Sequence, residues 1–388
     1  MAQDFTTLIE LVRRYSPSGQ EQAAVDYLLG RMAELGFTRT YRDEVGNAVG
    51  VMGKGPRQIV LLGHIDTVPG EIPVSLAPLT STPPAPLPLS QWERGRGVAD
   101  RPGGGGEGSE GVLHGRGSVD AKGPLAAFVD AVAAVGAVDG WQLVVIGAVD
   151  EERDSTGARH LAASGAYRPE YAIIGEPNRW ERVALGYKGT AWAEVTVTCP
   201  QAHTASGQQT AAEAAVTFWL AVKAHAGAFN TGKPRPFDQL LPTLRGIQSG
   251  EDGFSQWARL RIGCRLPVEV GPEAWYAVLR EQTSEVLKTS EVSINPLGHP
   301  VPAWRGERNT PLVRAFLGAI RAAGGKPGFV RKTGTADVNI VAPAWKCPAV
   351  VYGPGDSALD HTPREHISLA EYARAVEVLV HVLRRLTG

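Results

Sequence analysis

The stretch QIVLLGHIDTV, residues 58–68, begins as an apolar run and ends in polar side chains. A short apolar run that is bounded by Gly-Pro on one side and by Gly on the other predicts a buried strand. His64 and Asp66 follow this run two residues apart, so both point to the same face of an extended chain. Two explanations fit the pair. Either the two side chains simply hydrogen-bond to each other at the end of the strand, or His64 is a metal ligand and Asp66 is the carboxylate that orients it. The stretch alone leaves both explanations open.

Similar apolar strands alternate with helices through most of the chain. Strands are predicted at 47–53, 58–64, 141–152, 171–177 and 347–352, and helices at 4–15, 19–36, 122–137, 156–165, 310–323 and 368–386. Alternation of this kind is typical of the α/β class, in which helices cover the faces of a sheet. We therefore expect an α/β domain built on a mixed sheet.

The pattern changes at Gly186. Residues 188–200 and 257–267 alternate with a period of two, 208–226 and 272–289 are helical, and 291–297 forms a further strand. This block predicts a small α+β domain with one sheet face in solvent. The α/β pattern resumes afterwards, so the expected organisation is a larger domain of residues 1–184 and 301–388 with residues 185–300 inserted into it.

The segment 75–110 fits neither domain. It is dense in proline and glycine and shows no hydrophobic periodicity, so it is unable to form a core of its own. Its removal would leave a connection of ordinary length. A tolerated surface insertion is the simpler interpretation, and a lid or docking loop is the alternative.

Composition excludes several classes of protein. The net charge is −1 over 388 residues, which argues against a general nucleic-acid binder and against a polybasic membrane anchor. The three cysteines are widely spaced and give neither a disulfide framework nor a cysteine zinc site. No signal peptide or membrane-spanning run is recognisable, so we expect a cytoplasmic protein.

Polar side chains gather at the ends of the predicted strands. They are His64, Asp66, Asp120 in GRGSVDAKG, Glu151 and Glu152 after LVVIGAVD, Glu176 in IIGEP, and His361 in DHTPREHI. In α/β sheets, ligands bind at the carboxyl ends of the strands. Two histidines among several acids suit a pair of Zn²⁺ ions, because crowded carboxylates repel one another unless a metal charge balances them. The sequence therefore predicts a metal site.

The motifs GHIDTV, GRGSVDAKG, DEE, GEP and HTPREHI, in this order, resemble those of the M20 family of dinuclear zinc peptidases and deacylases. The resemblance covers the whole chain except the segment 75–110. It implies two Zn²⁺ ions per subunit, with Co²⁺ as a substitute, and a homodimer. It also implies that the inserted domain is a ferredoxin-like lid and dimerisation domain.

The resemblance assigns a role to each strand-end residue. It makes five residues metal ligands: His64, Asp120, Glu152, Glu176 and His361. Asp120 would bridge the two ions, and Asp66 would orient His64. Glu151 would be the general base that takes a proton from a metal-activated water and passes it to the departing amine. His203, in QAHTASG, would reach into the partner's active site as an oxyanion donor. His366 competes with His361, but the spacing of HTPREHI matches the family ligand at His361.

Substrate contacts are expected from the inserted domain and from the segment RKTGTADVN. By resemblance, Arg265 and the loop residues Thr333, Gly334 and Thr335 would hold a carboxylate of the substrate. The motifs look most like the branch that releases lysine or ornithine from the C-terminal glutamate of an acidic amino-group carrier protein. Asp337 would then either meet the cationic side chain of the substrate or serve a structural role.

Other functions stay open. A small-molecule deacylase of acetylated lysine or ornithine, or a dipeptidase, is the alternative enzyme, and an inactive binding protein is the remote one. Docking of an acidic carrier calls for a basic surface beside the active site. Candidates for that surface are Arg179, Arg182, Lys188, Lys233 and Arg235.

Overall fold

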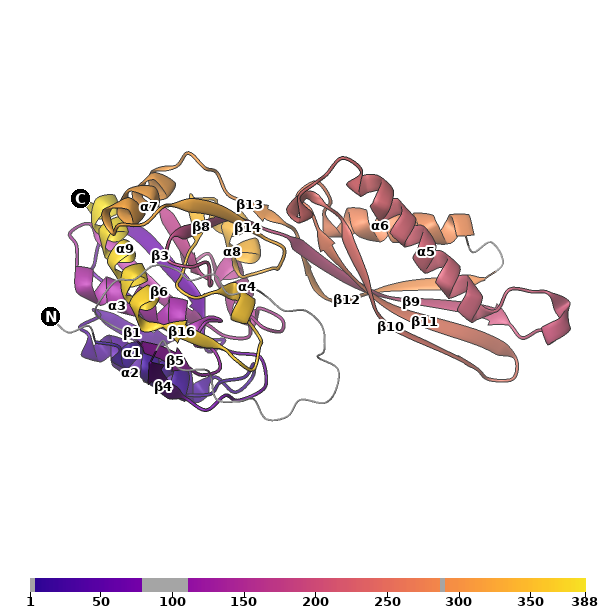
Figure 1. The fold of residues 1–388 in the computed structure, drawn as a ribbon, viewed down its shortest axis with the longest axis horizontal. Coiled ribbons are helices and arrows are strands. Elements are labelled where there is room, and N and C mark those ends of the chain that lie inside the picture. Colours follow the sequence, from indigo (N-terminus) through magenta and orange to yellow (C-terminus); the bar gives the residue numbers. More distant parts are fainter. Residues whose placement is uncertain (1–3, 79–110, 287–289) are drawn as a thin grey trace. The chain divides into compact units, whose positions relative to one another are not determined.

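The computed structural model describes residues 4–78, 111–286 and 290–388. The chain forms two compact units (Figure 1). Unit 1 comprises Met1–Ala184, Glu307–Val330 and Ala344–Gly388, and unit 2 comprises Leu185–Gly306 and Arg331–Pro343.

Unit 1 is built on a mixed sheet with the strand order β1-β2-β6-β3-β7-β15-β8. These strands are β1 (Arg39–Arg42), β2 (Ala48–Met52), β3 (Arg57–His64), β6 (Trp141–Ala148), β7 (Tyr171–Gly175), β8 (Arg182–Tyr187) and β15 (Ala349–Val351). The short strands β13 (Trp304–Arg305) and β14 (Gly328–Lys332) both pair with β8. The four central strands β6, β3, β7 and β15 are parallel, whereas β1 and β2 run antiparallel. The predicted α/β class is confirmed.

Helices pack against this sheet and against one another. They are α1 (Thr6–Arg13), α2 (Gln22–Glu34), α3 (Lys122–Val135), α4 (Thr156–Ser164), α7 (Pro311–Ala322) and α9 (Leu369–Thr387). A further helix, α8 (Val338–Trp345), belongs mostly to unit 2. The start of α3 lies very close to the central strands. A Cβ atom at Gly63 would lie 3.2 Å from the Leu125 side chain, and one at Gly175 would lie 2.9 Å from the Phe128 ring. Glycine at both strand ends therefore lets α3 reach the edge where the polar motifs lie.

Unit 2 is a four-stranded antiparallel sheet with two helices on one face (Figure 1). The sheet order is β10-β11-β9-β12, with β9 (Gly189–Pro200), β10 (Leu241–Glu251), β11 (Ser255–Leu266) and β12 (Glu291–Val301). The helices are α5 (Ala211–Asn230) and α6 (Pro272–Val286). Alternate residues of β9 and β11, such as Val195 and Leu260, form a buried core with Phe218 of α5 and Trp275 of α6. The element order β-α-β-β-α-β is the split βαβ arrangement.

Residues 331–343 group with unit 2, although the sequence placed them with the larger domain. The reason is a buried amide: Asn339 Nδ2 donates to Lys188 O at 3.1 Å and to Pro302 O at 2.8 Å. These two bonds fix the loop that contains Thr333 to Thr335 on the strands of unit 2.

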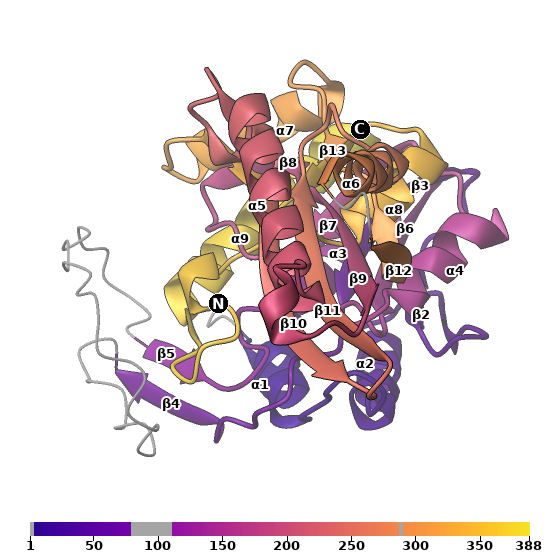
Figure 2. The same ribbon diagram turned by 90° about the vertical axis from the view of Figure 1, so that its right-hand side faces the viewer.

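The segment 79–110 lies outside the described residues, but its flanks are well defined. β4 (Ser75–Pro78) and β5 (Gly111–His114) pair antiparallel, in a small sheet that β16 (His366–Ser368) completes (Figure 2). Pro78 and Gly111 are direct register partners. The start of the predicted insertion at residue 75 is therefore corrected, because residues 75–78 belong to a strand.

We predict that replacing residues 79–110 by Asn-Gly leaves the fold and the turnover nearly unchanged. Pro78 and Gly111 already face each other across a β-ladder, so a two-residue hairpin turn closes the gap. The check is the melting temperature and the specific activity of the shortened chain. A fall in melting temperature of more than about 5 °C, roughly 1 kcal/mol or more in a domain of this size, would show that the segment stabilises the fold.

In the described part of the chain, no helix is both long and apolar enough to cross a membrane.

Candidate active site

Three neighbouring parallel strands end at the same edge of the unit 1 sheet. β3 pairs with β6 and with β7, and in that register His64 lies opposite Ala148 and Gly63 opposite Gly175. The chain beyond β6 therefore presents Glu151 and Glu152 on one side of His64. Glu176 follows Gly175 directly on the other side. The register brings these strand-end motifs to one edge of the sheet, as the sequence predicts.

Four side chains converge at this edge. His64 Nε2 lies 3.2 Å from Asp120 Oδ1, and His361 Nε2 lies 3.0 Å from both Asp120 Oδ2 and Glu152 Oε1. Ligand atoms of His64, Asp120 and Glu152 lie within 4.8 Å of one another. Asp120 thus stands between the two histidines, with one oxygen toward each.

Glu176 is half-buried at the same edge. Its carboxylate is not part of the His64–Asp120–Glu152 group of the described residues.

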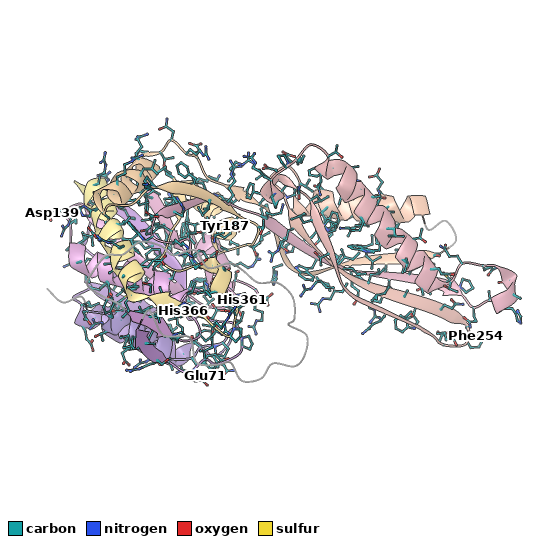
Figure 3. All side chains as sticks on the ribbon, viewed as in Figure 1. Glu71, Asp139, Tyr187, Phe254, His361 and His366 are labelled. Atoms are coloured by element: carbon teal, nitrogen blue, oxygen red, sulfur yellow. The ribbon has the colours of Figure 1, made fainter. Side chains whose placement is uncertain are left out.

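His361 belongs to the loop that follows β15, and its side chain is 52% exposed (Figure 3). Its backbone has φ 62°, a left-handed conformation that non-glycine residues rarely adopt. Strain of this kind persists mainly at functional sites, where the surroundings hold the residue in place. His366 lies instead on β16, where its ring packs against His114 at a centroid distance of 5.0 Å.

The pKa values of Asp120, His361 and His64 show that the negative charge of this cluster favours a bound positive charge. Burial raises the pKa of Asp120, but its contacts with His361 and His64 prevail and hold that pKa well below its usual range. Contacts with Asp120 and Glu152 raise the pKa of His361 to about 10. Burial lowers the pKa of His64, yet its contacts with Asp120 and Asp66 raise it well above the usual range. Three carboxylates, those of Asp66, Asp120 and Glu152, thus favour the protonated form of the two imidazoles in the absence of another cation.

This donor set fits divalent metal ions of the zinc type. Zn²⁺ takes imidazole nitrogen and carboxylate oxygen, and both donor types are present here within 4.8 Å of one another. A bound cation would take the place of the protons on the histidines and would balance the carboxylates.

Asp66 connects two of the motifs. Its carboxylate accepts from the backbone N–H of Glu151 and of Glu152, each at 3.1 Å, and from Ser18 Oγ at 2.6 Å. Its backbone oxygen lies 3.0 Å from His64 Nδ1, whereas its Oδ1 lies 3.5 Å away. Burial raises the pKa of Asp66, but the contacts with His64 and Ser18 and the bond from the Glu152 N–H outweigh it, so that pKa is lowered. Asp66 therefore fixes the position of the Glu151–Glu152 turn as well as that of His64.

Sequence reasoning missed a second buried carboxylate, Glu365. Its Oε1 accepts from the N–H groups of Val119 and Asp120 at 2.9 and 3.0 Å, and its Oε2 pairs with Arg116 Nη1 at 2.9 Å. Glu365 is fully buried, and burial raises its pKa. It holds the loop that presents Asp120. Its place four residues after His361, within the motif HTPREHI, is the signal that would have found it.

Lys122 is a further buried charged residue that the sequence did not reveal. Its side chain is fully buried and donates to Arg14 O at 2.6 Å. Burial lowers its pKa to about 7.

Unit 2 holds the remaining predicted site residues at two separate places. Arg265 Nη1 donates to Thr335 Oγ1 at 3.0 Å, and Thr333 and Gly334 lie in the same loop. Asp337 is buried just before α8. His203 follows the opposite end of β9 and is exposed, and its Nδ1 accepts from the Ala205 N–H at 3.1 Å. A neutral His203 in this arrangement carries its proton on Nε2, which is then available as a donor.

The basic residues predicted to dock a carrier do not form a set of free cations. Lys188 is fully buried and donates to the backbone oxygens of Pro236 and Phe237 at 3.2 and 3.1 Å. The remaining four are engaged by neighbours: Arg179 by Asp356, Arg182 by Lys326 O, Lys233 by Glu269 and Arg235 by Asp238. The prediction was wrong for Lys188, because sequence alone did not show that three carbonyls surround it.

Comparisons with known proteins agree with this geometry. The model of peptidase family M20/M25/M40 matches residues 60–385. A [LysW]-lysine hydrolase from Deinococcus radiodurans is 41% identical over 389 residues, which cover 98% of this chain and 97% of that protein. A [LysW]-lysine/[LysW]-ornithine hydrolase from Sulfurisphaera tokodaii is 28% identical over 392 residues, covering 98% and 94%.

Among solved structures, an M20 family metallo-carboxypeptidase from Sulfolobus solfataricus is similar with a TM-score of 0.72. The match covers 100% of both chains at 15% identity, a level that shows the shared fold alone.

Proposed function

The chain belongs to peptidase family M20/M25/M40, and we propose that it is a metal-dependent amide hydrolase that releases lysine or ornithine from the carrier protein LysW. The observation that carries this proposal is the 41% identity, over nearly the full length of both chains, to a [LysW]-lysine hydrolase. The convergence of His64, Asp120, Glu152 and His361 supports a metal centre in this chain. On this proposal the protein completes an amino-acid biosynthesis in the cytoplasm.

We assign two Zn²⁺ ions to the group of side chains at the strand ends, with Co²⁺ able to replace them. His64 and Glu176 would hold one ion, Glu152 and His361 the other, and Asp120 both. The orientation of the two Asp120 oxygens toward the two histidines supports the bridging role. When bound, the metal pair supplies Lewis acidity that lowers the pKa of the attacking water and polarises the amide carbonyl.

Residues of the chain carry out the proton transfers. Glu151 takes a proton from the attacking water as the new C–O bond forms, and it then delivers that proton to the nitrogen of the departing amine as the amide C–N bond breaks. Its backbone is fixed by Asp66, which supports a constant position of the carboxylate during both transfers.

The substrate carboxylate is assigned to Arg265, Thr333, Gly334 and Thr335. The bond from Arg265 to Thr335 supports this assignment, since it joins the guanidinium to the loop at one site. Asp337 is buried next to this loop, and its burial favours a structural role over contact with the cationic side chain of the substrate.

A homodimer through unit 2 is part of the proposal. β10 is an edge strand of 11 residues, and edge strands of this length are open to pairing with another chain. Ile247 on this strand is 48% exposed, and Leu220 and Val216 on α5 are 61% and 47% exposed. Exposed apolar side chains beside an unpaired edge support contact with a second copy.

The deciding experiment compares substrates at equal metal loading. We expect LysW-linked lysine or ornithine to be hydrolysed with a kcat/KM at least ~100-fold above that of Nα-acetyl-lysine, because contacts with the carrier add binding energy in the transition state. Equal or faster hydrolysis of the acetylated amino acids or of dipeptides would favour the small-molecule deacylase. A chain with two bound metals and no turnover of any of these substrates would instead be a binding protein.

A further inference from the structure

The face of the unit 2 sheet that points away from α5 and α6 has an unusual composition. Alternate residues of β9 and β11 face the helices, so their neighbours face the other way. Six large side chains occupy this uncovered face: Trp192, Arg245, Trp257, Arg259, Arg261 and Arg265. We call it the arginine–tryptophan face.

The two tryptophans are held flat by glycines on the neighbouring strands. Gly263 pairs with Trp192, and a Cβ atom on this glycine would lie 2.9 Å from the indole. Gly250 pairs with Trp257 in the same way, with a Cβ distance of 2.7 Å. An aromatic ring that covers a cross-strand glycine is a stable arrangement. The rings therefore form a fixed platform on the sheet.

Arginines stand beside both rings. The Arg261 guanidinium lies 5.7 Å from the Trp192 ring centroid, and the Arg259 guanidinium lies 5.5 Å from that of Trp257. Cation–π contacts at these distances order the guanidinium groups without neutralising them. The planar donor fork of each arginine remains available for carboxylates.

Positive charge prevails on the β10–β11 side of this face. Glu194 on β9 pairs with Arg259 at 3.4 Å. Within the described ranges, neither Arg245 nor Arg261 forms an ion pair, and both are exposed. The whole chain carries a net charge of −1, so this concentration of arginine is local and does not reflect a basic protein.

The face is continuous with the assigned substrate-binding residues. A hollow of about 190 Å³ lies on it, lined by Trp192, Thr243, Arg245 and Arg265 among others. Arg265 at its end also donates to Thr335 in the loop that we assign to the substrate carboxylate. A protein whose attached amino acid is held at Arg265 would thus have its own surface close to Arg245 and Arg261.

We propose that the arginine–tryptophan face docks an acidic surface of the carrier protein. The inference rests on the proposed function, since it needs a substrate that is borne by a protein. Exposed guanidinium groups select carboxylates, and the carrier is the protein that the proposed reaction brings to this position, so the surface that it presents here is expected to be acidic. Remote contacts of this kind add to the binding energy at the scissile amide.

The test is the double variant Arg245→Glu/Arg261→Glu, which leaves Arg265 in place. At low ionic strength we expect the KM for carrier-linked lysine to rise about 10-fold or more, because the carrier now meets like charge. Hydrolysis of Nα-acetyl-lysine should change by less than about twofold. The rate with the carrier should also lose most of its dependence on salt, since the screened charges are gone.

A matched control reverses two exposed arginines that do not belong to this face, Arg280 on α6 and Arg321 on α7. Arg280→Glu/Arg321→Glu changes the net charge by the same amount and should alter the hydrolysis of neither carrier-linked lysine nor Nα-acetyl-lysine. The variant Arg245→Gln/Arg261→Gln keeps the side-chain size and should give an intermediate loss. The loss of carrier affinity is also measured without turnover, in proteins that carry Glu151→Gln. When the carrier conjugate is titrated into these proteins, the double glutamate variant should show a higher Kd than the protein with both arginines.

The two proposals fail in distinguishable ways. If the wild-type enzyme hydrolyses the carrier conjugate and the double glutamate variant keeps the same KM and Kd, the docking face is wrong and the function stands. If the metal-loaded wild-type enzyme does not hydrolyse the conjugate at all, the function itself is wrong. Sheets with aromatic and basic side chains also bind single-stranded RNA. The inference would be overturned if the wild-type protein binds an oligouridine and the double glutamate variant loses that binding but still binds the carrier. The face would then be assigned to nucleic acid.

Discussion

Replacing Glu151 by glutamine is expected to lower kcat by at least ~10²-fold while the metal content per subunit stays unchanged. The substitution keeps the size and hydrogen-bonding shape of the side chain but removes its ability to accept a proton. The Asp120 carboxylate contacts His64 and His361, and the backbone N–H of Glu151 is held by Asp66 regardless of the Glu151 side chain. The fold and the ligand cluster therefore have no reason to change.

Metal analysis alongside steady-state kinetics checks this prediction. The neighbouring Glu152→Gln variant is the matched control, because Glu152 lies 3.0 Å from His361 Nε2 within the cluster and should lose metal as well as activity. Asp120→Ala should lose more metal still, since both histidines contact Asp120. Wild-type turnover by a well-folded Glu151→Gln protein would remove Glu151 from the mechanism.

The site was predictable to the extent that it depends on where strands end. The run from Ile59 to Leu62 is apolar because β3 is buried between β6 and β7, and the change to polar residues at His64 marks the edge of the sheet. The same transition after β6 and β7 locates Glu151 and Glu176. Parallel neighbours end at one edge, so a pattern along the sequence became a cluster in space.

Contacts between distant segments were not predictable in this way. Glu365 and Arg116 are separated by 249 positions, and no local pattern links a buried carboxylate to a loop so far away. Lys188 appeared to be a surface cation because lysine is almost never fully buried. β10 was missed because Gly246, Gly250 and Pro242 disrupt the strand pattern, and the glycines prove to serve packing and a register shift.

The second substitution expected to lower turnover strongly is at His203, and the reason is the position of this residue. Arg265 pairs with Thr190 at the start of β9, whereas His203 follows Pro200 at its end. Ten residues of strand span roughly 33 Å, far more than the length of an amide-linked lysine. One substrate molecule therefore cannot contact both Arg265 and His203 of the same subunit. If both act in catalysis, His203 must serve the active site of a partner subunit.

We accordingly predict that His203→Ala lowers kcat by about 10²-fold or more, as the loss of an oxyanion donor does, and that mixing subunits restores activity. In a hybrid of His203→Ala with Glu151→Gln, the first subunit keeps Glu151 and receives His203 from the second. Random exchange between dimers gives half hybrids with one competent site each, so the mixture should recover up to about a quarter of the wild-type rate.

A second mixture tests the same idea through a loss of activity instead of a gain. The double variant His203→Ala/Glu151→Gln, mixed with wild-type subunits, should form hybrids with no competent site. The wild-type subunit in such a hybrid keeps Glu151 but receives alanine at position 203, so activity falls below the value expected for simple dilution. A histidine that acts within its own subunit predicts the reverse: no recovery in the first mixture and undiminished activity per wild-type subunit in the second. Subunit exchange is verified with differently tagged chains, and the two mixtures together decide whether unit 2 completes its own active site or that of its partner.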